Sequence, residues 1–376
     1  MSGPFAPKLD RPCIVAGSRR RHQRAEVPVR KTFLSLAVAT VAAIAWPMAG
    51  ATAATGAAAV GGSGPCGSLT APPTYQHVIW IWMENHSFGD IIGNTSQAPY
   101  INSLAAECGL ATNYHNISHP SLPNYIGGTS GLALSQLRLF KSDCSPSKKC
   151  STAAPSIFSQ GETWKAYEES MPAACDGANA GEYAVRHNPP PYYSSLAGCS
   201  AFDVPYTQLA GDLAANTLPA FSFITPNLID DMHDGTIADG DAWLASNLPT
   251  ILNSAEYQSG STAVFITWDE GTGGKSAEDC AANTTDASCQ VATIVISPST
   301  PAGSTSATLF NHYSLLGTTE QLLGLPALGQ ASAYPTMTAA FNLQATRFRR
   351  AGDRLCRSPA PRAMAAARRI RTRSTP

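Results

Sequence analysis

A short apolar segment that stops abruptly on polar side chains is the feature that most constrains how this chain can fold. Residues 77–83 (HVIWIWM) have the length and composition of a buried strand, and Glu84 and Asn85 follow them directly. In open α/β sheets, ligands bind in the crevice beyond the carboxyl ends of the strands. The segment therefore offers oxygen ligands, from a carboxylate and an amide, to a cation or to phosphate chemistry.

A second segment has the same design, because residues 263–268 (AVFITW) end on Asp269 and Glu270. Two strands that each deliver such side chains to one edge of a sheet predict a single shared metal site.

Further apolar runs predict strands at 221–225 and 292–297, and helices at 98–107, 241–252 and 312–323. Strands that alternate with helices predict an α/β three-layer sandwich, whose mostly parallel central sheet has helices on both faces. Residues 140–200 hold four cysteines among clustered prolines and glycines, and we expect an irregular, disulfide-tied excursion there.

Charge is segregated along the chain. Residues 1–31 carry eight Lys or Arg, residues 344–376 carry ten Arg, and the part between holds seven basic against 23 acidic side chains, a net charge of −16. Such an acidic body argues against nucleic acid as a partner and suits an acidic environment.

The ends of the chain read as processing and tail segments. Residues 1–53 are expected to be a signal peptide with a long basic n-region, because residues 33–46 are apolar but short for a membrane span and Ala-rich sequence follows. We expect a secreted protein, exported by either the general secretory or the twin-arginine route, with no stable membrane anchor after processing. Residues 54–73 then form a flexible lead-in, 74–343 the catalytic domain, and 344–376 a disordered Arg-rich tail able to contact anionic surfaces weakly.

The cysteines agree with export. Eight lie between residues 66 and 289, an even number that predicts disulfides, and none has the spacing of a zinc finger. The sequence does not fix their connectivity; we expect the pairs Cys144–Cys150, Cys175–Cys199 and Cys280–Cys289, which leaves Cys66–Cys108.

The segment 112–131 is dense in histidine, hydroxyl and amide side chains held between prolines and glycines. A serine beside a cation and a base is what nucleophilic attack requires, and Ser121 is the candidate, with Ser118 as competitor. His115 could belong to the site or bond its own loop. Elsewhere, His77 and His187 are expected to be structural or exposed, and Asp230 and Asp231 to lie at the surface.

These segments resemble the phosphoesterase family of the alkaline phosphatase superfamily, which includes bacterial acid phosphatases and phospholipases C. The resemblance covers residues 77–343. Four ordered motifs carry it: E-N-x-S-F at 84–88, N-Y-H at 113–115 leading to P-S-L-P-N at 120–124, H-D at 233–234, and D-E at 269–270.

The resemblance implies an alkaline-phosphatase-like fold and a divalent cation, for which Mg²⁺, Ca²⁺ or Mn²⁺ is favoured and Zn²⁺ is not excluded. It implies metal ligation by Glu84, Asn85, Asp269, Glu270 and Ser121, with Ser121 also the nucleophile that forms a phosphoserine. The remaining catalytic residues implied are His119, Asn124, His233, Asp234 and His312; protonated histidines would also attract phosphate.

Two departures from the family pattern bear on the reaction. Gly89 precedes Asp90, and Leu122 stands where the phospholipase branch has Asp. Both favour a secreted acid phosphatase acting on a small phosphate ester over a phospholipase C-type phosphodiesterase. A non-catalytic extracellular binding protein is the alternative from another class, and the absence of C-x-P-x-R argues against a sulfatase.

Overall fold

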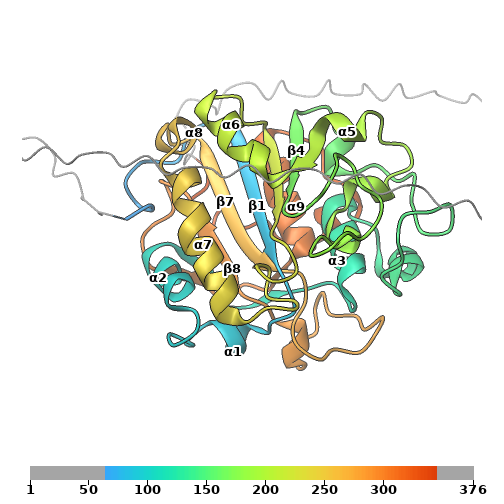
Figure 1. Ribbon diagram of the computed structural model, residues 1–376. Coiled ribbons are helices and arrows are strands. Elements are labelled where there is room, and N and C mark those ends of the chain that lie inside the picture. Colours follow the sequence, from blue (N-terminus) through green and yellow to red (C-terminus); the bar gives the residue numbers. More distant parts are fainter. Residues whose placement is uncertain (1–63, 345–376) are drawn as a thin grey trace, which may run out of the picture. The chain divides into compact units, whose positions relative to one another are not determined.

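The computed structural model describes residues 64–344, which form an eight-stranded sheet with helices on both faces (Figure 1). β8 runs antiparallel to its neighbours and the other strands are mutually parallel, so the predicted mostly parallel α/β sandwich is confirmed. In spatial order the strands are β5 (Asp203–Pro205), β4 (Trp164–Glu168), β6 (Phe221–Thr225), β1 (His77–Met83), β7 (Thr262–Trp268), β8 (Thr293–Ile296), β2 (Gly109–Ala111) and β9 (Ser304–Ser306). A separate parallel pair joins β3 (Tyr114–His115) to β10 (Phe310–Asn311).

The helices form the two outer layers. In Figure 1, α7 lies on the near side of the sheet beside β7, whereas α9 lies behind β1. α2 packs beside α7, and α3 packs beside α9. The longer helices are α2 (Pro99–Glu107), α3 (Ser121–Ser130), α7 (Ile237–Leu252) and α9 (His312–Leu323); the short ones are α1 (Phe88–Ile91), α4 (Leu134–Leu137), α5 (Cys199–Phe202), α6 (Leu209–Ala214) and α8 (Ala255–Gln258).

β1 is the centre of the core because helices cover both of its faces. Six of its seven residues are buried, as expected for a parallel strand inside an α/β sheet. Trp80 donates its indole N–H to Thr319 of α9 at 2.9 Å. Trp82 packs on Tyr125 of α3 with ring centroids 4.9 Å apart. These contacts fix α3 and α9 against one face of β1, the strand that leads to Glu84.

Most predicted elements form where expected, with two differences. α7 begins at Ile237 rather than 241, because Thr236 and Asp239 form a capping box that starts the helix one turn earlier. β4 lies inside the region expected to be irregular. All four predicted disulfides are present: Cys66–Cys108, Cys144–Cys150, Cys175–Cys199 and Cys280–Cys289.

The predicted signal peptide, most of the lead-in and nearly all of the Arg-rich tail lie outside the described residues. Within residues 64–344, no helix has both the length and the apolar character needed to cross a membrane.

Candidate active site

Glu84 and Asp269 meet because they extend two neighbouring strands in register. β1 and β7 pair in parallel, with Met83 opposite Trp268, so the next residue of each strand emerges at the same edge of the sheet. The backbone N–H of Asn85 donates to Asp269 Oδ1 at 3.1 Å. Asn85 has a φ of 52°, in the left-handed region that asparagine tolerates better than most residues. The turn after β1 thereby brings the predicted acid and amide groups together.

Ser121 is the first residue of α3 and points at the same carboxylate. Its hydroxyl donates to Glu84 Oε2 at 3.0 Å. One helical turn later, the Tyr125 hydroxyl donates to Glu84 Oε1. Ser118 instead donates to the carbonyl of His119 at 3.4 Å. Of the two candidate nucleophiles, the structure places Ser121 on Glu84.

The site concentrates buried negative charge. Glu84, Asp269 and Asp231 have no exposed surface. Burial, and then the neighbouring Asp269 and Asp231, hold the pKa of Glu84 well above its usual range. Burial also raises the pKa of Asp269 to about 7. Asn85 Oδ1 and Asp269 Oδ2 are buried and have no hydrogen-bond partner within residues 64–344. Unpartnered hard oxygens among clustered carboxylates fit a divalent cation.

Asp231 and His187 belong to this cluster, so the expected surface position of Asp231 is wrong. Asp231 bonds His187 Nδ1 at 3.1 Å, and His187 Nε2 lies 3.3 Å from Glu84 Oε1. The imidazole stacks on the Tyr125 ring, with centroids 5.4 Å apart. Burial holds the pKa of His187 well below its usual range. His187 therefore links two acids and is neither exposed nor remote from the site.

His233, Asp234 and Arg186 form the outer side of the site. His233 Nδ1 lies 2.7 Å from Asp234 Oδ1, and an Arg186 guanidinium nitrogen lies 2.9 Å from His233 Nε2. Because a guanidinium can only donate, Nε2 accepts and the proton of the neutral ring sits on Nδ1. The predicted pair of His233 and Asp234 is thus hydrogen-bonded to Arg186, which the sequence analysis did not identify.

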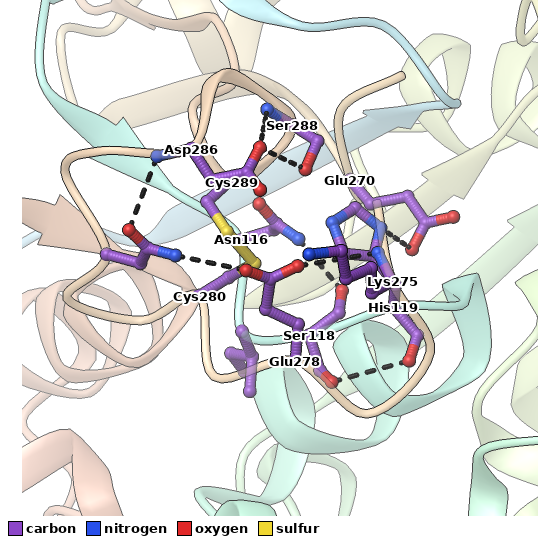
Figure 2. Close-up of a disulfide and its surroundings, with 12 residues drawn as sticks. Asn116, Ser118, His119, Glu270, Lys275, Glu278, Cys280, Asp286, Ser288 and Cys289 are labelled. Carbon is purple, nitrogen blue, oxygen red and sulfur yellow. Dashed lines mark hydrogen bonds and ion pairs between the residues drawn. A yellow bond between two sulfur atoms is a disulfide. The ribbon is translucent and has the colours of Figure 1, made fainter. Parts of the chain in front are cut away.

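His119 and Glu270 form a second His–carboxylate pair, at 2.9 Å between Nδ1 and Oε2 (Figure 2). His119 is 3% exposed, and burial lowers its pKa. Its Nε2 has no partner among the described residues. The segment leading into the Cys280–Cys289 disulfide covers this ring: Ala277 N–H donates to the His119 carbonyl at 2.7 Å, and Gly274 lies against the imidazole. The Glu270 carboxylate therefore fixes the orientation of the His119 ring.

Asn124 and His312 are placed differently from the catalytic residues expected. Asn124 Oδ1 accepts from the backbone N–H groups of Ile117 and Ser118, at 2.8 and 3.0 Å. His312 is fully buried, its pKa lowered to about 4 by burial. Its Nε2 lies 2.7 Å from the Asp269 carbonyl, so this nitrogen donates, and Nδ1 accepts from Tyr114. Both side chains support the loops that carry Ser121 and Asp269.

The sequence predicts that protonated histidines attract phosphate, and the burial of these histidines argues against it. Burial lowers the pKa values of His119, His187 and His312, so these rings favour the neutral form. Arg186 is the permanent cation beside the cluster, and it opposes the raised pKa values of Asp231 and Glu270. Residues 32–343 hold only seven Lys or Arg, and Arg186 is followed directly by His187; this rarity of basic residues was the sequence signal that could have identified Arg186.

Comparisons with known proteins give several matches. The profile of the phosphoesterase family matches residues 94–326. A phosphatidylinositol-3-phosphatase of Mycobacterium tuberculosis is 33% identical over 277 residues, which cover 72% of this chain and 84% of that protein. A phosphate-repressible acid phosphatase of Penicillium chrysogenum is 28% identical over 274 residues, covering 68% of this chain and 61% of the fungal protein. A solved structure in the alkaline phosphatase superfamily, from Vibrio parahaemolyticus, aligns with a TM-score of 0.48 and 11% identity, covering 71% of this chain and 72% of that one.

Proposed function

Because the chain belongs to the phosphoesterase family and is a phosphoric ester hydrolase, we propose that it is a secreted, metal-dependent acid phosphatase acting through a phosphoserine at Ser121. The observation that carries the proposal is the position of Ser121 Oγ, 3.0 Å from a buried carboxylate whose neighbours hold two unpartnered oxygens. A serine so placed has an acceptor for its proton and lies beside a ligand set for a cation.

The residues divide the chemistry between two steps. Ser121 Oγ attacks phosphorus while its proton passes toward Glu84, the P–O bond to the alcohol breaks, and a protonated His119 supplies the proton that the alcohol oxygen needs. Water then cleaves the phosphoserine and releases phosphate. A divalent cation, held by Glu84, Asn85, Asp269 and Ser121 with Glu270 beside them, would neutralise phosphate charge and favour the ionised serine.

The working pH follows from His119. An acid must be protonated to donate, and burial lowers the pKa of His119. Loss of that proton should therefore occur at a lower pH than for an exposed histidine. This favours turnover in acid and fits the acidic body of the chain.

Substrate and location are part of the same proposal. The partner is a small phosphate ester rather than nucleic acid, because the body is acidic. The Mycobacterium tuberculosis relative is a phosphatidylinositol-3-phosphatase, so a phosphorylated inositol lipid is one candidate substrate. Four disulfides support secretion; we propose no membrane anchor after processing, and only weak contact of the Arg-rich tail with anionic surfaces.

The test compares p-nitrophenyl phosphate with p-nitrophenylphosphorylcholine from pH 4 to 9, with and without EDTA, using the chain from about residue 54. We expect monoester turnover that peaks in acid and falls with EDTA. Ser121→Ala should abolish turnover with its circular dichroism unchanged, whereas Ser118→Ala, the matched control, should retain it. Diester turnover alone would assign a phospholipase C-type phosphodiesterase, and silence on both substrates with added metals would favour a non-catalytic binding protein.

A further inference from the structure

Two carboxylates lie buried where β4 pairs with β5, at one edge of the sheet. Glu168, the last residue of β4, is 1% exposed, and Asp203, the first residue of β5, has no exposed surface. The strands pair in parallel with Ala166 opposite Asp203, so Glu168 lies two residues further along on the same face. No ion pair within residues 64–344 includes either carboxylate. Buried acids without a basic partner require a proton or a cation.

Asn188 brings a third oxygen to this pair from a separate loop. Its Nδ2 donates to Asp203 Oδ2 at 2.9 Å. The Thr225 hydroxyl lies 3.5 Å from Glu168 Oε1 and 3.3 Å from the backbone carbonyl that precedes Asn188. These contacts join Glu168, Asn188 and Asp203 into one group, which we call the edge cluster.

Two oxygens of the edge cluster lack a partner. Asn188 has no exposed surface, and neither its Oδ1 nor Asp203 Oδ1 has a hydrogen-bond partner within residues 64–344. Burial raises the pKa of Glu168 well above its usual range and that of Asp203 to about 7. A single divalent cation would offset both negative charges and contact both unpartnered oxygens. Carboxylate and amide oxygens are the ligands that Ca²⁺ takes in proteins, and the cluster has no thiolate or imidazole to favour a transition metal.

The backbone holds both acids in place. Cys175 N–H donates to the Asp203 carbonyl at 3.0 Å, and Cys199 Sγ, in the disulfide with Cys175, lies 3.7 Å from Asp203 Oδ2. On the other side, Glu168 lies opposite Thr225 in the pairing of β4 with β6. A ligand set that the fold positions in advance costs less to order when the ligand binds.

We propose that the edge cluster binds Ca²⁺ through its two carboxylates and Asn188 Oδ1, as a structural site distinct from the cation site beside Ser121. Binding to the folded chain alone raises its stability. Asn188 directly follows Arg186 and His187, so the same ion fixes the segment that carries these two side chains.

The experiment measures Ca²⁺ binding by equilibrium dialysis at pH 8, and the melting temperature with Ca²⁺ or EDTA. It uses an Asp269→Asn background, which removes a carboxylate from the catalytic ligand set; Glu84→Gln replaces it should that variant fail to fold. In this background we expect one Ca²⁺ bound per chain. The melting temperature should rise by about 5 °C when Ca²⁺ is about 100 times its Kd.

Asp203→Asn and Glu168→Gln, each added to this background, should abolish both the binding and the rise in melting temperature. Glu256→Gln is the matched control. Glu256 is also buried, with both carboxylate oxygens unpartnered among the described residues, but it belongs to α8. Its replacement should leave Ca²⁺ binding unchanged.

The inference would be overturned by an Asp269→Asn protein that binds no Ca²⁺, or by binding that survives both substitutions in the edge cluster. A melting temperature that rises in acid and ignores Ca²⁺ would also overturn it, because the two carboxylates would then share a proton. The proposed function is tested separately, by turnover of the wild-type protein, so either proposal can fail while the other stands.

Discussion

Asn124 provides a sharp test of how the site is held together, because its side chain bonds only to the backbone. Oδ1 accepts from the N–H groups of Ile117 and Ser118, and Nδ2 donates to the carbonyls of Ser118 and Pro120 at 2.8 and 3.3 Å. The residue has no exposed surface. Asn124→Ala therefore removes the only side chain shown to satisfy two buried donors in the turn that precedes Ser121.

The magnitude follows from those two donors. A buried N–H that loses its acceptor costs about 1–3 kcal/mol, so the free energy of unfolding should fall by about 2–6 kcal/mol. A domain has a stability of about 5–15 kcal/mol, so the variant should fold but melt much earlier. Asn124→Asp retains an acceptor oxygen for these two N–H groups and loses only the donor amide, so its free energy of unfolding should fall by less than that of Asn124→Ala.

The assay is urea unfolding with the disulfides intact, paired with kcat on the fraction that remains folded. Asn247→Ala is the control: this half-buried side chain accepts from the Tyr206 hydroxyl and donates to the Trp243 carbonyl, and because water can replace both partners its loss should cost about 1 kcal/mol. The positioning role would be refuted by an Asn124→Ala protein of wild-type stability whose kcat has collapsed. That result would return Asn124 to the catalytic role expected from the sequence.

Two further predictions concern other parts of the fold. Burial raises the pKa of Glu320 to about 7, and its Oε2 has no hydrogen-bond partner among the described residues, so wild-type stability should fall as the pH rises through 7. In urea unfolding at pH 5 and pH 8, Glu320→Gln should lose less stability between the two pH values and be more stable at pH 8 by about 1–2 kcal/mol; an equal loss in both proteins would contradict the prediction. Gly274→Ala would bring a Cβ within 1.8 Å of His119 Nε2, so monoester turnover should drop by about 10–100-fold while thermal stability changes little. Gly177→Ala, where a Cβ meets nothing within 4 Å, is the control, and full activity in Gly274→Ala would remove His119 from the proposed chemistry.

The parts that could be predicted from the sequence are those set by periodic burial. Residues 77–83 and 263–268 have a composition that only a doubly covered strand explains, so the polar residues after them had to meet at one edge of a parallel sheet. The same reasoning located α9 and the acids that adjoin Ser121.

The missed residues lie where no periodicity operates. Arg186 and His187 belong to the region expected to be irregular, in which disulfides, prolines and single hydrogen bonds hold the backbone. Asp231 was expected at the surface. Its burial depends on His187, which is 44 residues away in sequence. Side chains whose surroundings come from distant loops carry no local signal.

Three of the four disulfides constrain the loops that surround the site, which form its walls. They do not constrain the strand ends beneath it, which form its floor. Cys144 follows Asp143, whose carboxylate accepts from the Leu122 N–H next to Ser121. The Cys175–Cys199 loop contains Arg186, and Cys280 lies at the end of the segment over His119. The floor, made by the ends of β1 and β7, depends on core packing alone. A chain whose thiols are still reduced can therefore build the sheet before its site is enclosed. On the proposed secretion, hydrolytic competence would lag behind folding of the sheet until these cysteines are oxidised.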